Sequence, residues 1–258
     1  MSPQPAAALS VVIPTYNEHG RLEELVGQTF KVFADAGLDG ELVIVDDNSP
    51  DGTGALADEL AGRYRLKVVH RAGKLGLGTA VVEGFAAASS DVMGVMDADL
   101  SHPPELLARM FRAIRDEGAD FVIGSRYVPG GGTRNWELSR RLMSRLACLL
   151  ARPVTPVRDA TSGFFLVRRE IAKGVKIQAG GFKICLELLV RGHARSIVEV
   201  PYVFAGRSVG QSKMNSREAA GYLLQLRDLW RHRRHDLAGA ARRTHRILPP
   251  DGPVPSGR

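Results

Sequence analysis

The stretch that decides the fold reads Val95-Met96-Asp97-Ala98-Asp99-Leu100-Ser101-His102-Pro103. The apolar run 92–96 leads into two aspartates two residues apart, and in an extended segment such side chains point to the same side. They therefore converge at the end of a strand, where open α/β sheets bind ligands. Neighbouring carboxylates repel unless a cation or a proton lies between them, and a divalent ion that also binds substrate phosphates is the usual solution. The alternative is a strand-end aspartate followed by a turn or N-cap aspartate.

Composition favours one large α/β domain, because the 258 residues are 44% hydrophobic and 24% charged. Only Cys148 and Cys185 are present, so neither disulfides nor a structural zinc site is expected. A reducing, cytoplasmic location is expected instead. Residues 1–8 do not resemble a signal peptide, and no apolar run approaches the roughly 18 to 20 residues that span a bilayer. The net charge of +7 indicates an anionic partner: a phosphate-bearing substrate, anionic lipid or nucleic acid.

Short apolar runs alternate with segments of helical periodicity through the first 130 residues. The expected strands are 9–14, 41–46, 66–70, 91–96 and 121–125, and the expected helices are 21–36, 53–64, 79–88 and 104–117. This alternation predicts right-handed βαβ crossovers and a mostly parallel, twisted sheet flanked by helices. We assign residues 9–130 to a nucleotide-binding part of a single domain that extends over residues 1–230.

Residues 131–230 are less regular and are expected to contact the acceptor or an interface. A flexible loop (129–133) precedes a helix at 138–152, and a short strand (164–167), a helix (182–191), an edge strand (196–204) and a helix (217–230) follow. Helix 138–152 has an apolar arc opposite a basic one, which is typical of a helix at a membrane surface, although the apolar arc could equally pack on the core. The basic, Pro-rich segment 231–258 is expected to be a disordered tail.

Four polar loops follow four of the expected parallel strands and should therefore meet at one edge of the sheet. They carry Glu18, Asp47, Asp97 and Asp99 beside Tyr16 and Arg126. An acidic edge on a basic protein suits a metal-bound nucleotide whose phosphates also need cations. Arg207 and Lys213, on a glycine-rich loop, are candidate phosphate ligands, or else residues of a solvated surface loop.

Several common site types lack their motifs. Gly76-Leu77-Gly78 has Val81 where the dinucleotide-binding motif has its third glycine, which counts against a nicotinamide enzyme. No P-loop motif and no Gly-x-Ser-x-Gly motif is present. His102, beside the acidic pair, is expected to be structural. A basic nucleic-acid- or nucleotide-binding module is the alternative outside enzymes, but the acidic edge and the lack of interleaved aromatic and basic residues oppose nucleic-acid binding.

The ordered motifs resemble those of family-2 glycosyltransferases with the GT-A fold, and more narrowly the dolichol-phosphate and polyprenol-phosphate mannose synthases. The resemblance extends from about Ser10 to about Met214. The segments that carry it are Pro14-Thr15-Tyr16-Asn17-Glu18, Val45-Asp46-Asp47-Asn48-Ser49-Pro50-Asp51-Gly52-Thr53, Lys74-Leu75-Gly76-Leu77-Gly78-Thr79-Ala80, Asp97-Ala98-Asp99-Leu100-Ser101-His102-Pro103, Gly124-Ser125-Arg126-Tyr127, Asp159-Ala160-Thr161-Ser162-Gly163, Phe182-Lys183-Ile184 and 207–213.

This resemblance implies the roles of individual residues. The guanosine of GDP-mannose would be bound by Pro14, Tyr16, Glu18, Val45 and Asp47. The diphosphate would lie at Asp97, Ala98 and Asp99, with Mg²⁺ or Mn²⁺ among Asp97, Asp99 and Ser101. Arg126, Arg207 and Lys213 would contact phosphates, and Asp99 and Arg126 would be the catalytic residues. The chain departs from the family at Phe165, where relatives often have arginine, at Ser101, where some have glutamine, and in lacking the C-terminal transmembrane helices of many relatives.

The function implied is transfer of mannose from GDP-mannose to a polyprenyl monophosphate, with inversion. A phosphate monoester is already largely ionised at pH 7, so the acceptor needs no general base. Another hexose, such as glucose from UDP-glucose, or another phosphorylated acceptor remains an alternative, because a fold does not fix a substrate. The protein is expected to be peripheral at the cytoplasmic face of a membrane, bound directly or through a separate membrane-anchoring protein.

Overall fold

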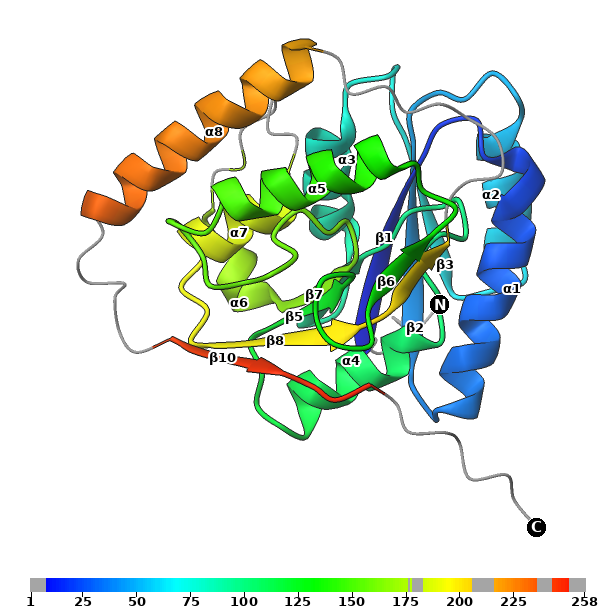
Figure 1. Cartoon of the computed structure of the whole chain (residues 1–258). Coiled ribbons are helices and arrows are strands. Elements are labelled where there is room, and N and C mark those ends of the chain that lie inside the picture. Colours follow the sequence, from blue (N-terminus) through cyan, green and yellow to red (C-terminus); the bar gives the residue numbers. More distant parts are fainter. Residues whose placement is uncertain (1–7, 176, 178–182, 206–215, 236–242, 251–258) are drawn as a thin grey trace.

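The computed structural model describes residues 8–175, 177, 183–205, 216–235 and 243–250 (Figure 1). The strands are β1 (Leu9–Thr15), β2 (Gly40–Asp46), β3 (Leu66–His70), β4 (Val92–Val95), β5 (Phe121–Ser125), β6 (Gly132–Arg134), β7 (Phe165–Arg168), β8 (Ser196–Pro201), β9 (Val203–Ala205) and β10 (Thr244–Ile247). The helices are α1 (His19–Asp35), α2 (Thr53–Ala61), α3 (Leu77–Ala87), α4 (Leu106–Arg115), α5 (Leu138–Leu150), α6 (Arg169–Ala172), α7 (Ile184–Arg191) and α8 (Ser216–His235).

The central sheet has the strand order β10-β8-β5-β7-β4-β1-β2-β3. Its strand pairs are parallel except for those that β7 makes with β4 and β5, which are antiparallel. The expected mostly parallel sheet is therefore confirmed. Because β4 and β5 lie on either side of one antiparallel strand, they run in the same direction, and the carboxyl ends of β1, β2, β4 and β5 meet at one edge.

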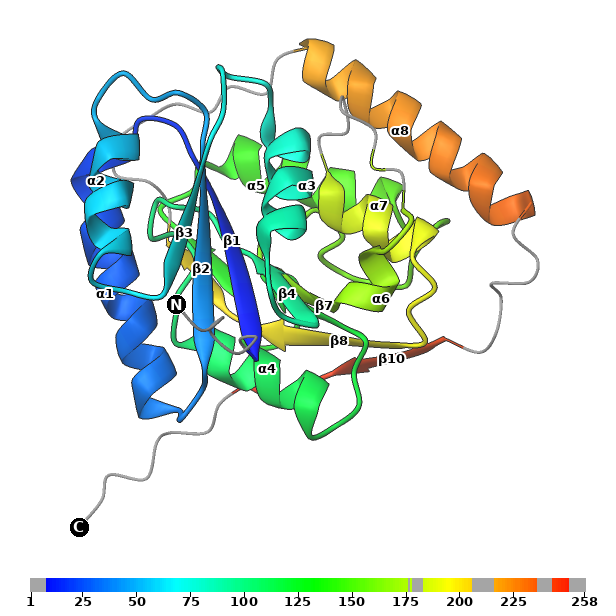
Figure 2. The ribbon, with the colours of Figure 1, turned by 180° about the vertical axis from the view of Figure 1, so that it is seen from behind.

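Helices cover both faces of the sheet because successive residues of the buried strands point to opposite faces. Val11 and Ile13 of β1 belong to a core shared with α1, α2 and α4, whereas Val12 belongs to a second core shared with α3, α7 and α8. Figure 2 shows α1 and α2 on one side of strands β1 to β3 and α3 on the other. Gly84 of α3 permits this close packing, because a Cβ there would overlap Val12.

The structure corrects three sequence-based expectations in the second half of the chain. Segment 196–204 is not an edge strand: it divides into β8, which lies between β5 and β10, and β9, which pairs with β6 in a separate two-stranded sheet. The expected loop 129–133 accordingly runs into strand β6. The expected tail 231–258 is not wholly disordered, because α8 continues to His235 and β10 extends the sheet, as Figure 1 shows in red.

Candidate active site

The candidate site lies at the edge of the sheet where β1, β2, β4 and β5 end. Side chains join the first two of these ends, since Thr15 Oγ1 donates to Asp46 Oδ1 over 2.9 Å. The backbone joins them again, because Asp47 N–H donates to the carbonyl of Thr15 over 3.1 Å. The loops after β1 and β2 therefore meet, and the strand directions place the loops after β4 and β5 at the same edge.

A tight turn holds the acidic pair after β4. Leu100 has a φ of 61°, a left-handed conformation that is uncommon for a non-glycine residue, and it turns the chain back toward Asp99. Asp99 Oδ1 then accepts the Ser101 N–H over 3.1 Å and also accepts the Ser101 hydroxyl. Asp99 and Ser101 are both buried. Ser101 thus fixes the orientation of the Asp99 carboxylate, while its direct contact with a metal stays a prediction.

Asp97 lies beside the loop that precedes β7. A Cβ added to Gly163 would lie in van der Waals contact with Asp97, 3.4 Å from its Oδ1, so this loop passes directly beside the carboxylate. His102 Nδ1 accepts the Asp97 backbone N–H over 3.1 Å, and its ring stacks on Phe164 with centroids 5.0 Å apart. Burial lowers the pKa of His102, which keeps the ring neutral. The expected structural role of His102 fits this geometry.

The donor atoms suit a hard divalent cation. Asp97 and Asp99 offer carboxylate oxygens, and the Asp97 side chain keeps 35% of its surface exposed, so an ion can reach it. Within the described part of the chain, no group of three or more His, Cys, Asp or Glu residues could enclose a metal. Two carboxylates, completed by substrate phosphates and water, are the ligand set that Mg²⁺ commonly has. The residues therefore fit a Mg²⁺ or Mn²⁺ ion.

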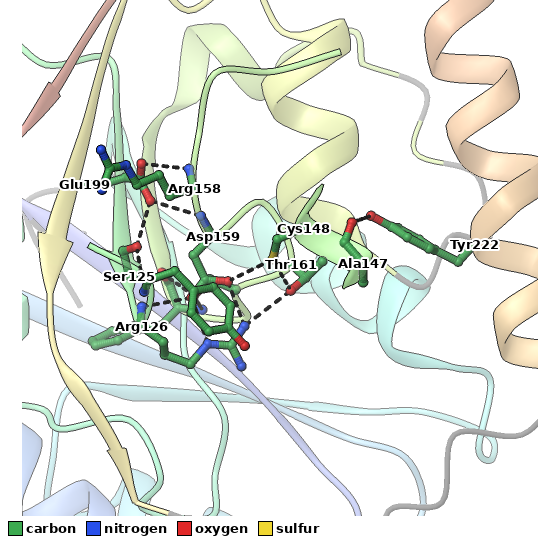
Figure 3. Close-up of polar contacts among 12 residues, drawn as sticks. Ser125, Arg126, Ala147, Cys148, Arg158, Asp159, Thr161, Glu199 and Tyr222 are labelled. Carbon is green, nitrogen blue, oxygen red and sulfur yellow. Dashed lines mark hydrogen bonds and ion pairs between the residues drawn. The ribbon is translucent and has the colours of Figure 1, made fainter. Parts of the chain in front are cut away.

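Arg126, directly after β5, is anchored by a buried carboxylate (Figure 3). Asp159 accepts the Arg126 Nε–H over 2.7 Å, its Nη2–H over 2.7 Å and its backbone N–H over 2.9 Å. The Arg126 side chain is 9% exposed and that of Asp159 is 0% exposed. Burial acts to lower the pKa of Arg126, but the adjacent Asp159 outweighs burial and raises it. The guanidinium therefore stays charged in a fixed orientation.

Aromatic rings connect Arg126 to the arginines of α5. The Arg126 guanidinium lies 5.4 Å from the Trp136 ring centroid and 5.3 Å from that of Tyr127. Arg140 lies 4.2 Å from the same Trp136 ring, and Arg145 lies 5.9 Å from the Tyr127 ring. Sequence reasoning named Arg140 only as part of a basic arc and did not name Arg145. It missed their proximity to Arg126, which depends on how α5 crosses the end of the sheet.

A second buried arginine holds Asp47, one of the residues expected to bind the donor base. Arg71 forms an ion pair with Asp47, and its Nε–H donates to Glu83 over 3.1 Å. Sequence reasoning missed Arg71 although it directly follows β3, so the rule that located the other loops would also have located it. Beside this pair, the Lys74 ammonium lies 4.1 Å from the Tyr16 ring centroid.

The remaining predicted residues are distributed around the same edge. Val45 is buried in β2, and Pro14 is half-buried in β1. Glu18 is the N-cap residue of α1, and its backbone N–H donates to Thr53 Oγ1 over 2.9 Å. Ala98 is buried between the two aspartates. The predicted phosphate ligands Arg207 and Lys213 lie outside the described residues.

Lys183 adds a further cation that sequence reasoning quoted only as part of a motif. Burial and the Arg126 guanidinium lower its pKa, whereas Asp97 acts to raise it. Lys183 therefore lies within electrostatic range of Asp97 and Arg126. A cleft of about 390 Å³, lined by Pro103, Glu105 and Arg134 among others, opens beside the turn that holds the acidic pair, although neither aspartate lines it.

Comparison with known proteins gives consistent results. The family model described as glycosyl transferase family 2 matches residues 10–176. A dolichol-phosphate mannosyltransferase of Pyrococcus furiosus is 44% identical over 84% of this chain and 62% of its own length, so the chain spans less than two thirds of that relative. The Saccharomyces cerevisiae dolichol-phosphate mannosyltransferase is 36% identical over 86% of each chain. The Mycolicibacterium smegmatis polyprenol monophosphomannose synthase is 42% identical over 84% of this chain and 85% of its own.

Solved structures share the fold at lower identity. Glucosyl-3-phosphoglycerate synthase from Mycobacterium tuberculosis, solved with Mn²⁺ and UDP, has a TM-score of 0.61 at 22% identity and covers 85% of this chain and 80% of its own. A mannosyltransferase from Pyrobaculum calidifontis, solved with GDP-Man and Mn²⁺, has a TM-score of 0.62 at 19% identity. The match covers 86% of this chain and 64% of the mannosyltransferase chain. These matches confirm the expected fold, an α/β nucleotide-sugar transferase fold of the GT-A type.

Proposed function

The chain belongs to glycosyl transferase family 2, and on that premise we propose that it transfers mannose from GDP-mannose to a polyprenyl monophosphate, with inversion. The relatives named above support the reaction class. The observation that carries the proposal is the opposition of charges at one edge of the sheet. The Asp97 and Asp99 carboxylates follow β4 and the fixed, buried guanidinium of Arg126 follows β5, and these two strands end at the same edge of the sheet.

The chemical difficulty is electrostatic, because an anionic acceptor must approach an anionic donor. A bound Mg²⁺ or Mn²⁺, held by Asp97 and Asp99, would neutralise the diphosphate as it departs. Arg126 supplies positive charge that is oriented before the substrates arrive, and preorganised charge of this kind stabilises transition states most effectively. The acceptor phosphate is itself the nucleophile and needs no proton removed at neutral pH. Asp47, oriented by Arg71, would bind the nucleoside at the opposite end of the same edge.

We propose that the acceptor phosphate enters between Arg126 and α5. Arg140 and Arg145 extend the positive region outward from Arg126 through the Trp136 and Tyr127 rings. Arg207 and Lys213 are proposed as additional phosphate ligands. Guanidinium groups suit this role because they bind phosphate oxygens in a bidentate manner.

The lipid part of the acceptor would approach along α5. The leucines and the methionine of its apolar arc are 44% to 71% exposed, and among its residues only Cys148 is buried. This exposure favours the interpretation of α5 as a helix at a membrane surface over packing of its apolar arc on the core. An exposed apolar arc flanked by arginines suits a helix lying in the surface of an anionic membrane. On the neighbouring α8, Leu223, Leu224 and Trp230 are also exposed.

We propose that the protein binds the cytoplasmic face of a membrane peripherally, through these two helices. Among the described residues, no helix is both long and apolar enough to cross a bilayer. Cys148 and Cys185 are both free thiols, which is consistent with a reducing compartment. A membrane-anchoring protein would then strengthen the attachment without being required for it.

One assay tests the reaction. The purified chain is incubated with labelled GDP-mannose or UDP-glucose, a polyprenyl monophosphate and Mn²⁺, with and without EDTA, and lipid products are separated by thin-layer chromatography. We expect a mannolipid that disappears with EDTA and falls by about 10² to 10³-fold in Asp99→Asn, by analogy with the loss of one transition-state contact. Formation of a glucolipid in place of the mannolipid would show that UDP-glucose, and not GDP-mannose, is the donor. Release of free sugar without lipid product would contradict the proposed transfer.

Vesicle sedimentation tests the membrane contact. Binding to anionic vesicles should be lost in the Leu142→Gln, Leu146→Gln double variant. The Val82→Gln variant makes the same kind of change at an exposed residue of α3 and should keep wild-type binding. Equal binding by the double variant and wild type would show that α5 is not the contact, and no binding by wild type would indicate recruitment by another protein.

A further inference from the structure

Strand β10 lies beyond the segment that the sequence assigned to the catalytic domain, yet it is joined to the site. It pairs in parallel with β8, from Thr244 opposite Ser196 to Ile247 opposite Glu199. The Leu248 N–H continues the pairing by donating to the carbonyl of Glu199 over 2.9 Å. Figures 1 and 2 both show β10 beside β8. Strand β10 therefore contacts Glu199, a residue of β8 that hydrogen-bonds to the candidate site.

The Glu199 side chain is 0% exposed, and four donors converge on its two oxygens. Oε1 accepts the Ser125 hydroxyl over 2.7 Å and the Asp159 N–H over 3.0 Å. Oε2 accepts the Arg158 N–H over 2.8 Å and lies 2.8 Å from Nε2 of His245. Figure 3 shows Glu199 beside Ser125, Arg158 and Asp159.

The His245 ring must donate in this arrangement. The other three partners all present hydrogens to the carboxylate, and a carboxylate can only accept. His245 lies on β10 and is the one partner that comes from beyond β8. Its imidazole is half-buried, with 18% of the side chain exposed. The histidine therefore supplies the fourth hydrogen bond to an otherwise fully enclosed carboxylate.

The same carboxylate sets the backbone position of Asp159. The Asp159 N–H donates to Glu199, and the Asp159 carboxylate accepts from Arg126. Ser125, the residue before Arg126, also donates to Glu199. Glu199 thus holds both segments that form the Arg126–Asp159 pair. The segment after β10 supports the loop that follows Arg126, because a Cβ on Gly130 would lie 2.6 Å from Pro250 Cβ.

We infer that His245 is a positioning residue for the transfer reaction: through Glu199 it fixes Asp159, and thereby the guanidinium of Arg126. This inference rests on the proposed function of Arg126. Without His245, the Arg158 N–H is the one named donor left on Glu199 Oε2, so the carboxylate is held less firmly and the Asp159 and Ser125 contacts on Oε1 loosen with it. This loosening affects charge stabilisation in the transition state and leaves the nucleoside end of the site, at Asp47 and Arg71, unchanged.

Three variants in the full chain test this role. His245→Phe keeps a ring and removes the donor, whereas His245→Gln keeps an N–H in about the place of Nε2. Arg246→Ala alters the neighbouring residue of β10, which forms an exposed ion pair with Glu117 at 3.4 Å, and serves as the control for damage to the strand. Each variant is assayed for mannolipid formation with its folded fraction measured by circular dichroism.

We expect His245→Phe to lower kcat by about tenfold to a hundredfold, because small misplacements of a catalytic group have effects of this size. The KM for GDP-mannose should stay within about twofold, since the lost interaction is made in the transition state. His245→Gln and Arg246→Ala should keep near-wild-type kcat. Wild-type kcat in His245→Phe, or an equal loss in His245→Gln, would overturn the inference.

A spectroscopic measurement separates failure of this inference from failure of the proposed function. The Nε–H resonance of Arg126, identified by its loss in Arg126→Lys, reports the hydrogen bond to Asp159 in the absence of substrate. It should shift in His245→Phe and return in His245→Gln. An unshifted resonance overturns the positioning role whatever the chain catalyses, whereas a wild-type chain that forms no lipid product contradicts only the proposed function.

Discussion

Replacing Asp159 by asparagine removes the carboxylate that holds Arg126 and changes little else. Asparagine has nearly the same shape, but it keeps one oxygen, gains an NH₂ group and loses the charge. Three hydrogen bonds from Arg126 converge on Asp159 at 2.7 to 2.9 Å. Because the asparagine oxygen cannot serve all of them, and its NH₂ group faces a guanidinium, the variant leaves a buried positive charge without its partner.

The magnitude follows from the burial of both side chains, 9% and 0% exposed. Removing one member of a buried ion pair costs about 3 to 5 kcal/mol of unfolding free energy. At about 2 to 4 °C per kcal/mol for a chain of this size, the melting temperature should fall by about 6 to 20 °C. Mannolipid formation should fall as well, because Arg126 no longer keeps its orientation.

Chemical unfolding followed by circular dichroism, together with calorimetry, measures the change. The control is Asp35→Asn, the same substitution in the exposed Lys31–Asp35 pair of α1, which should change stability very little. The double variant Arg126→Met, Asp159→Leu should be more stable than Asp159→Asn, because it removes both charges together. Equal unfolding of Asp159→Asn and Asp35→Asn, or a double variant that is the least stable of the three, would contradict the expected cost of leaving Arg126 unpaired.

Three further predictions concern other parts of the molecule. Gly84→Ala should destabilise by about 1 to 3 kcal/mol in chemical unfolding, because the added Cβ overlaps a buried valine of β1, whereas Gly20→Ala in α1 has no atom within 4 Å and should not destabilise. Arg71→Met should raise the KM for GDP-mannose with little change in kcat, since it frees Asp47 at the nucleoside end, and steady-state kinetics that show a lower kcat with an unchanged KM would contradict it. Burial acts to raise the pKa of Glu41, but hydrogen bonds from Ser10 and Ser89 outweigh it and lower the pKa below its ordinary value of 4.5. The stabilisation by ionised Glu41 is therefore fully present above pH 4.5 and is lost as the pH falls through the lowered pKa of the folded state, so the stability difference between wild type and Glu41→Gln should shrink on acidification from pH 6 to pH 3.

Much of the nucleotide-binding half could be predicted from local pattern. Strands β1 to β5 were expected within a few residues of where they lie, because a strand buried on both faces is a continuous apolar run. The convergence of Asp47, Asp97 and Asp99 at one edge also followed, since parallel strands place their carboxyl ends together. Arg71 could have been found by the same rule.

The sequence by itself determined the alternation of elements, the acidic edge and the family motifs, because each depends on residues close together along the chain. The tertiary structure alone decided the partners of Arg126: Asp159 lies 33 residues away, and the two meet because β7 inserts antiparallel between β4 and β5. It also decided that 244–247 is a strand, since a segment that is half exposed has no distinctive hydrophobic pattern and gains its structure from the edge of β8. The local hydrophobic pattern indicates which side chains of a helix or strand are buried. The pairing of segments far apart in the sequence depends on the order of the strands in the sheet, which no local pattern contains.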